Sequence, residues 1–243
     1  MKRSFDILVS GLGLLLLSPL LVAVAIAIYL QDYNSPFYIA SRVGRGERPF
    51  RMVKFRSMVL RADATGVDST AGDDPRVTRL GAAIRRFKVD EIPQLLNVLI
   101  GSMSLVGPRP NVERETRLYT TDERRLLSVR PGITDLASIV FSDEGEILRG
   151  SDDPDLRYNQ VIRPWKSRLA LLYVDGRRTL TLDLRILWLT LVAAVDRDRA
   201  LAGVRRIAEL LGADKDLLGV IPRTAPLLSA APPGATDIVR SRA

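Results

Sequence analysis

Asp90 and Glu91 are adjacent carboxylates in the stretch Lys88-Val89-Asp90-Glu91-Ile92-Pro93-Gln94. Pro93 and the apolar run after it predict that a helix begins here, because proline is tolerated in the first turn of a helix. A helix N-terminus favours anions such as phosphate, since its first N–H groups are unpaired and its dipole is positive there. The pair therefore suits an anionic substrate that also needs a metal ion. An acidic first turn that only complements the dipole has the same spacing, and spacing alone favours that second interpretation.

The residue types present limit the available chemistry. The chain has no Cys and no His, which excludes disulfides, thiolate nucleophiles, His general bases and Cys/His zinc sites. Catalysis would have to use carboxylates, hydroxyls, Lys, Arg or a metal ion with oxygen ligands, and such ligands suit magnesium. The formal net charge of +8 predicts an anionic partner: nucleic acid, anionic lipid or a phosphorylated substrate.

A longer signature surrounds the two carboxylates. It comprises Asp90 to Gln94, then Asn97-Val98, Met103-Ser104 and Gly107-Pro108-Arg109-Pro110. In type and spacing it resembles the motif of the bacterial sugar transferases, the monotopic phosphoglycosyl transferases that start glycan assembly on a polyprenol phosphate. The segments Lys54 to Met58 and Arg130 to Thr134 match two further motifs, and the resemblance covers roughly residues 1–190. The chain departs from the usual family residues at Ala40, Lys88, Ser102 and Asp135-Leu136-Ala137-Ser138.

The resemblance implies a role for each carboxylate. Asp90 would attack the sugar-bearing phosphorus of a nucleotide diphosphate sugar, and a polyprenol phosphate would then take the sugar phosphate from the aspartyl intermediate. Glu91 would take part in catalysis as the residue that holds Mg²⁺. Two prolines fix the backbone around Arg109 and would preorganise its guanidinium for phosphate. The expected substrate-binding cations are Lys54, Arg56, Arg85, Arg109 and Arg130. For Lys54, Arg56 and Arg85, a solvated or lipid-facing charge is the alternative.

Residues 7 to 30 are almost wholly apolar. As a straight helix they would measure about 36 Å, which is enough to cross a bilayer. Ser18-Pro19 interrupts the run, and proline inside a helix kinks its axis. Basic residues flank both ends, and segments rich in Lys and Arg stay on the cytoplasmic side. These features alone leave a transmembrane span and a re-entrant helix open, and the resemblance favours a re-entrant helix that bends at Ser18 and Pro19.

Local patterns predict the remaining elements. Two segments rich in aromatic and β-branched residues flank a Gly-containing turn and indicate a β-hairpin. A polar, mobile loop and a short helix with Leu80, Ile84 and Phe87 on one face lead to the carboxylates. Tyr173 and Trp188 suit either a membrane interface or the core. The expected ranges are strands 36–40 and 50–55, loop 61–78, helix 76–87, loop 142–155, helix 200–218 and a disordered tail after residue 222.

We therefore predict an α+β, mainly helical fold in three parts. Residues 1–33 would form the re-entrant membrane helix. Residues 34–200 would form a small cytosolic catalytic domain with a short β-hairpin and amphipathic interfacial helices. Residues 201–243 would form a C-terminal amphipathic helix and a disordered tail.

The predicted function is the first membrane step of exopolysaccharide, capsule or other glycoconjugate synthesis. The partners would be a nucleotide diphosphate sugar, undecaprenyl phosphate and membrane lipids, at the cytoplasmic face of the bacterial inner membrane. The alternative is a non-catalytic, membrane-anchored scaffold with a basic lipid-binding face, which leaves the Asp90-to-Gln94 motif unexplained. No nucleic acid is expected, because no groove-reading or single-strand-binding motif occurs. The sequence does not determine the sugar, the nucleobase or the pathway, and a homodimer stays open.

Overall fold

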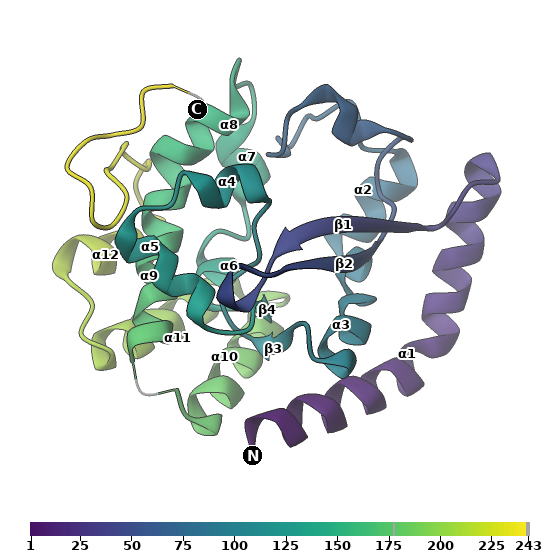
Figure 1. Ribbon diagram of the computed structural model, residues 1–243, viewed down its shortest axis with the longest axis horizontal. Coiled ribbons are helices and arrows are strands. Elements are labelled where there is room, and N and C mark those ends of the chain that lie inside the picture. The colour runs from purple at the N-terminus through teal and green to yellow at the C-terminus, as the bar shows by residue number, and fades with distance from the viewer. Residues whose placement is uncertain (177, 242–243) are drawn as a thin grey trace.

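Two small sheets connect an apolar N-terminal helix to a group of packed helices (Figure 1). The computed structural model describes residues 1–176 and 178–241, so the last two residues of the predicted tail lie outside the described part. The fold is mainly helical α+β with a two-stranded hairpin, as predicted. The elements are α1 (Lys2–Asp32), β1 (Phe37–Val43), β2 (Pro49–Phe55), α2 (Arg79–Arg86), α3 (Gln94–Ile100), β3 (Ser104–Val106), α4 (Glu113–Arg117), α5 (Thr121–Arg124), β4 (Gly132–Thr134), α6 (Leu136–Val140), α7 (Glu144–Leu148), α8 (Pro154–Arg157), α9 (Arg163–Asp175), α10 (Leu180–Ala193), α11 (Arg197–Leu210) and α12 (Lys215–Val220).

Helix α1 is long and bent. Among the described residues it is the one helix with the length and apolar composition needed to cross a membrane. It runs below the hairpin in Figure 1 and then turns upward along the edge of the molecule. Pro19 lies inside the helix and cannot donate to the carbonyl of Leu15, one turn earlier. The hydroxyl of Ser18 donates to that carbonyl at 2.7 Å instead, so the helix continues through the Ser-Pro pair and the freed carbonyl is still paired.

Polar side chains attach the start of α1 to the rest of the chain. The Nζ atom of Lys2 lies 2.6 Å from Oδ2 of Asp183 in α10. Arg3 donates to the carbonyl of Leu99 at 2.8 Å, at the C-terminal end of α3. The buried carboxylate of Asp6 accepts a hydrogen bond from the Ser104 hydroxyl at 2.9 Å. The first turns of α1 are therefore docked onto α3, β3 and α10.

The far end of α1 contacts the same domain. Ile28, only 1% exposed, packs in a small apolar cluster with Phe55 of β2 and Ile84 of α2. Asp32 accepts two hydrogen bonds from the guanidinium of Arg56, at 2.5 and 2.7 Å. Both ends of the apolar helix are consequently fixed to one folded unit, with the bend between them.

The hairpin is confirmed, with longer strands than the sequence predicted. β1 and β2 are antiparallel, and their register runs from Phe37 opposite Phe55 to Val43 opposite Pro49. Gly46 in the connecting turn has a φ of 68°, a left-handed conformation that glycine adopts without strain.

A second, parallel pair of strands was not predicted. β3 lies beside β4, with Ser104 opposite Gly132 and Val106 opposite Thr134. A Cβ atom on Gly132 would lie 2.1 Å from the backbone nitrogen of Gly107, so only glycine permits this approach. The pairing brings the Gly-Pro-Arg-Pro and Arg-Pro-Gly-Ile-Thr motifs together.

Several local predictions differ from the structure. α2 begins after Thr78, whose side chain caps it, and Phe87 is 73% exposed because it follows the last helical residue. Segment 142–155 contains α7 and the start of α8 instead of loop alone. The predicted helix 200–218 is divided into α11 and α12, with Gly212 at a φ of 83° between them.

The core gathers around α9, against which α6, α12 and the 3₁₀ turn Arg125–Ser128 pack. Tyr173 belongs to this core at 2% exposure, whereas Trp188 on α10 is 64% exposed, so only Trp188 is available to an interface. The described segment 223–241 forms neither helix nor strand but lies along α9, where Arg168 donates through Nη2 to the carbonyl of Ala231 at 3.1 Å. Its predicted disorder, like the proposed division at residues 33 and 200, stays a prediction.

Candidate active site

The two carboxylates lie in a single 3₁₀ turn, Val89–Glu91, directly before α3. Lys88 precedes the turn with a φ of 56°, a left-handed conformation that reverses the chain after α2. Pro93 has helical dihedral angles and immediately precedes α3, in agreement with the predicted helix start. Asp90 is buried at 7% exposure, while Glu91 is partly exposed.

Two cations from distant segments hold Glu91. Arg109 donates through Nη2 to Oε1 of Glu91 and through Nη1 to the carbonyl of Ile133 at 3.0 Å. The Nζ atom of Lys54 on β2 lies 3.7 Å from the same Oε1 atom. Arg109 thus connects the Asp90–Glu91 pair, called the dyad from here on, to β4. Lys54 on β2 supplies the second positive charge.

These contacts and burial change the ionisation of Glu91 and Lys54. Burial would raise the pKa of Glu91, but the charges of Arg109 and Lys54 outweigh burial and lower that pKa to about 2. Burial lowers the pKa of Lys54 to about 8, and the charge of Arg109 acts in the same direction against the attraction of Glu91. Glu91 is therefore a fixed anion at neutral pH, and Lys54 is a cation that titrates slightly above neutrality.

Asp90 has a different environment. Burial and the neighbouring charge of Glu91 raise its pKa, and the charges of Lys54, Arg85 and Lys88 partly oppose that effect. Within the described residues, its buried Oδ1 atom has no hydrogen-bond donor. An anionic oxygen without a donor is poorly stabilised, so it is available to attack an electrophile. The two carboxylates are thus suited to different tasks.

The donor set can hold a magnesium ion only together with a phosphorylated substrate. No group of three or more acidic side chains with metal-binding geometry occurs in the described part of the chain. Magnesium is commonly held by one or two carboxylates, with substrate phosphates and water as the other ligands. Oε1 of Glu91 carries both cations, whereas Oδ1 of Asp90 has no partner. Because both cations contact Oε1 of Glu91, its second carboxylate oxygen, Oε2, is the atom that would bind the ion, and Asp90 stays available for attack.

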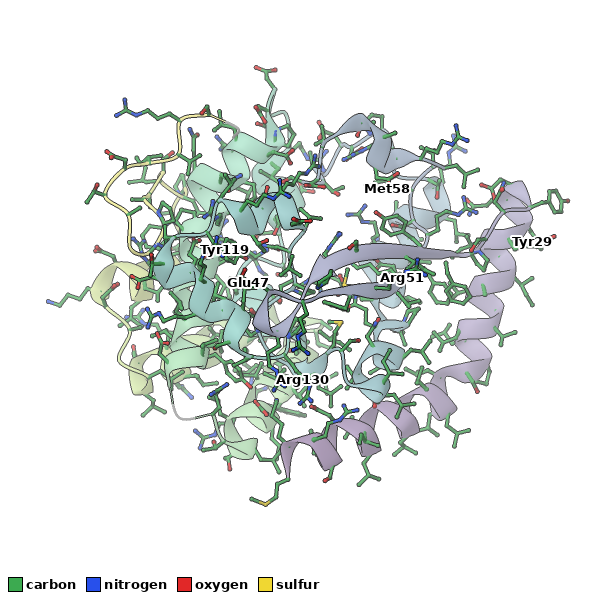
Figure 2. All side chains as sticks on the ribbon, viewed as in Figure 1. Tyr29, Glu47, Arg51, Met58, Tyr119 and Arg130 are labelled. Atoms are coloured by element: carbon green, nitrogen blue, oxygen red, sulfur yellow. The ribbon has the colours of Figure 1, made fainter. Side chains whose placement is uncertain are left out.

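The other predicted cations have separate positions. The charge of Arg85 partly offsets the rise in the Asp90 pKa, in keeping with a place near Asp90 and Glu91. Arg56 is buried against Asp32 and also donates to the carbonyl of Ser35 at 2.8 Å. Arg130 lies beside the C-terminal end of α3, where it donates to the carbonyl of Gly101 at 2.9 Å (Figure 2). The phosphate-binding roles of Arg56 and Arg130 remain predictions, and both side chains are engaged in structural contacts.

Arg42 is a further cation near the site, and it was not among the residues predicted to bind substrate. It shares one face of the hairpin with Tyr38 and Lys54, because Tyr38 pairs with Lys54 and side chains alternate along a strand. The next residue, Val43, donates its N–H to the carbonyl of Asn111 at 2.9 Å, beside the loop that carries Arg109. The sequence contained a signal for this position, because residues 38 and 42 are an even number of positions apart, and such residues share one face of an extended strand.

Two segments that the sequence left open have structural roles. Asp74 pairs with Arg76 at 2.6 Å, which agrees with a turn at this position. The guanidinium of Arg76 also donates to the carbonyls of Val67 and Ser69, so it organises the loop that was expected to be mobile. Asp135, where the chain departs from the family pattern, caps α6 by accepting from the N–H of Ser138 at 2.6 Å.

The chain is similar in sequence to several known proteins. The family model for bacterial sugar transferases matches residues 1–197. An exopolysaccharide production protein of Rhizobium leguminosarum bv. phaseoli is 37% identical over 82% of this chain and 97% of its own length. A UDP-N-acetylgalactosamine-undecaprenyl-phosphate N-acetylgalactosaminephosphotransferase of Aeromonas hydrophila is 41% identical over 68% of this chain and 40% of its own length. A UDP-glucose:undecaprenyl-phosphate glucose-1-phosphate transferase of Caulobacter vibrioides is 36% identical, and the match covers 68% of this chain and 64% of that protein.

Proposed function

Because the chain belongs to the bacterial sugar transferase family and is a transferase, we propose that it moves a sugar phosphate from a UDP-sugar to undecaprenyl phosphate. The reaction would release UMP and begin the assembly of an exopolysaccharide or a related glycoconjugate. The observation that carries the proposal is the dyad itself. A buried aspartate with an unpaired oxygen lies next to a glutamate that Arg109 and Lys54 hold as an anion.

Asp90 is the nucleophile in this scheme. Its carboxylate attacks the sugar-bearing phosphorus, a bond forms between that phosphorus and the Asp90 oxygen, and the bond to UMP breaks. An oxygen of undecaprenyl phosphate then attacks the same phosphorus, which releases Asp90 and yields the undecaprenyl diphosphate sugar. Neither displacement requires a histidine base, because both attacking groups are already ionised.

The surrounding charges stabilise the negative charge that develops on the diphosphate. Glu91, as a fixed anion, would hold a magnesium ion that neutralises part of the diphosphate charge. Lys54, Arg85 and Arg109 supply further positive charge, and Arg42 extends the same positive face along β1. Arg109 and Lys54 already contact Glu91 without substrate, so little rearrangement is needed to bring charge to the dyad.

A re-entrant α1, with both ends at the cytoplasmic face of the bacterial inner membrane, accompanies this proposal. A helix that crossed the bilayer would separate its two ends, yet Lys2 and Asp32 both pair with residues of one domain. Phe87 and Ile100, on either side of the dyad, are 73% and 75% exposed. Exposed apolar side chains at these positions support a dyad held at the depth of a lipid phosphate.

The decisive experiment is transfer by purified protein. Wild-type enzyme in detergent would be incubated with undecaprenyl phosphate and a panel of UDP-sugars, and UMP release and the lipid product would both be measured. One UDP-sugar should give both products, and intact-mass measurement without the acceptor should show one sugar phosphate added at Asp90. No turnover with any UDP-sugar, combined with binding to anionic vesicles, would favour the membrane-anchored scaffold instead.

A further inference from the structure

Gln94, the first residue of α3, is buried without any hydrogen-bond partner. Its exposure is 0%, and neither Oε1 nor Nε2 of its side-chain amide has a donor or acceptor within the described residues. Buried polar groups are nearly always paired, because an unpaired group loses its hydration without compensation. A fully buried amide without a protein partner therefore requires a partner from outside the chain.

Gln94 is not needed to dock α3 onto the hairpin. Asn97, one turn further along the same helix, does this with both atoms of its amide. Its Oδ1 accepts from the Val53 N–H at 2.9 Å, and its Nδ2 donates to the Arg51 carbonyl at 2.7 Å. Gln94 makes no such contact, so its amide is free for a ligand.

Gln94 is also close to the nucleophile along the helical backbone. Ile92 and Pro93 have helical dihedral angles, so the 3₁₀ turn that contains Asp90 continues directly into α3. Residues three or four apart on a helix are neighbours, and Asn97, three residues after Gln94, is bonded to β2, whose Lys54 charge also acts on Asp90. Asp90 and Gln94 therefore share the face directed at β2, and each has a buried side-chain atom without a partner.

We propose that Gln94 is a further catalytic residue, whose Nε2 donates to a non-bridging oxygen of the phosphoryl group as that group moves to and from Asp90. The proposal rests on the proposed function, since it assigns a donor to the same two displacements. A neutral amide in a buried site stabilises charge that develops on the phosphoryl oxygens without itself becoming charged, and it transfers no proton. A purely structural role would pair the Gln94 amide with Asp90 or another group of the chain, and neither atom of that amide has such a partner among the described residues.

The test compares Gln94→Met and Gln94→Glu with wild-type enzyme. Met has a similar volume but no donor, and removal of an oriented donor to a developing oxyanion lowers turnover ~10²- to 10³-fold. The KM for the UDP-sugar should stay near the wild-type value, because the bond strengthens only in the transition state. The Tm should not fall, since the variant removes a buried, unpaired polar group. Glu keeps the shape but replaces the donor with a carboxylate oxygen, and it should lose at least as much turnover.

Asn97→Leu is the structural control, and its Tm should fall because two backbone groups of β2 lose their partners. Turnover of Gln94→Met within threefold of wild type would overturn the proposal. The proposal would also be overturned if Gln94→Met melts as low as Asn97→Leu while Gln94→Glu keeps its turnover. That pair of results would assign Gln94 a packing role. Intact-mass measurement of wild-type enzyme separates this failure from failure of the proposed function. A wild type that turns over without an adduct at Asp90 contradicts the two-step scheme alone.

Discussion

Lys54 should give transfer activity an alkaline limit close to physiological pH. Its pKa is lowered to about 8, first by burial and then by the charge of Arg109, against the attraction of Glu91. The cationic form is the one that assists the diphosphate, so activity must fall as the pH rises through that pKa. With a pKa of about 8, about nine tenths of Lys54 is charged at pH 7, about half at pH 8 and about a tenth at pH 9. The kcat/KM for the UDP-sugar should therefore halve near pH 8 and fall roughly tenfold by pH 9.

The alkaline fall in activity should move to higher pH when substrate is bound. The pH dependence of kcat/KM reports the free enzyme, whereas that of kcat reports the enzyme–substrate complex. Two unit charges about 4 Å apart at an effective dielectric constant of 20 interact by ~4 kcal/mol, and one pKa unit corresponds to ~1.4 kcal/mol. These values set an upper limit of about three pKa units for the effect of a bound diphosphate on Lys54. A rise of at least about one unit is expected, so the alkaline fall in kcat should appear above about pH 9.

The assay is initial-rate UMP release between pH 6 and 10 at constant ionic strength. Lys54→Arg is the matched variant, because arginine stays protonated throughout this range. It should keep activity at neutral pH and lose the alkaline limb, while Lys54→Met should be slow and show no limb near pH 8. A flat wild-type profile from pH 7 to 9.5, or the same limb in Lys54→Arg, would refute the assignment of this limit to Lys54.

Three further outcomes are expected. Asp90→Asn should abolish transfer and Asp90→Glu should nearly do so, because the nucleophile must be an ionised oxygen at one distance; substantial UMP release by the Asn variant would remove Asp90 from that role. Activity should require a divalent ion, and Glu91→Gln should weaken the response to magnesium in a titration; full activity in EDTA would exclude the metal role. Replacing Ser18-Pro19 with Ala-Leu should straighten α1 and move the N-terminus to the outer side of the membrane. A single Cys beside Lys2 should then react with an impermeant maleimide in intact cells, and only in that variant. A single Cys in the hairpin turn should stay protected in both proteins. Labelling beside Lys2 in the parent protein would contradict the re-entrant helix.

The features that could be predicted from sequence depend on residues close to one another in the chain. Pro19 removes one backbone donor inside α1, and the preceding serine supplies another donor to the same carbonyl. The hairpin follows from alternating strand residues and the Gly46 turn. Pro93 marks the start of α3, with the two carboxylates directly before it. In each case sterics and local hydrogen bonds act within a few residues.

Local patterns were less reliable where the tertiary environment decides. Phe87 fits the apolar face of a helix by spacing, but α2 ends before it and leaves it exposed. Arg56 belongs to a matched motif, yet its guanidinium pairs with Asp32 at the end of α1. Motif spacing identifies which side chains are present, and packing determines where each one points.

The arrangement of the active site was decided only by the tertiary structure. The chain has 36 Lys and Arg and 28 Asp and Glu, and neither composition nor spacing selects which of them pair. Glu91 meets Arg109 because β3 and β4 join two motifs at Gly107 and Gly132, and it meets Lys54 because β2 packs beside the dyad. Burial likewise sets the direction in which the Lys54 and Asp90 pKa values move. Ion pairing and desolvation depend on distance and solvent access in three dimensions, which adjacent residues do not determine.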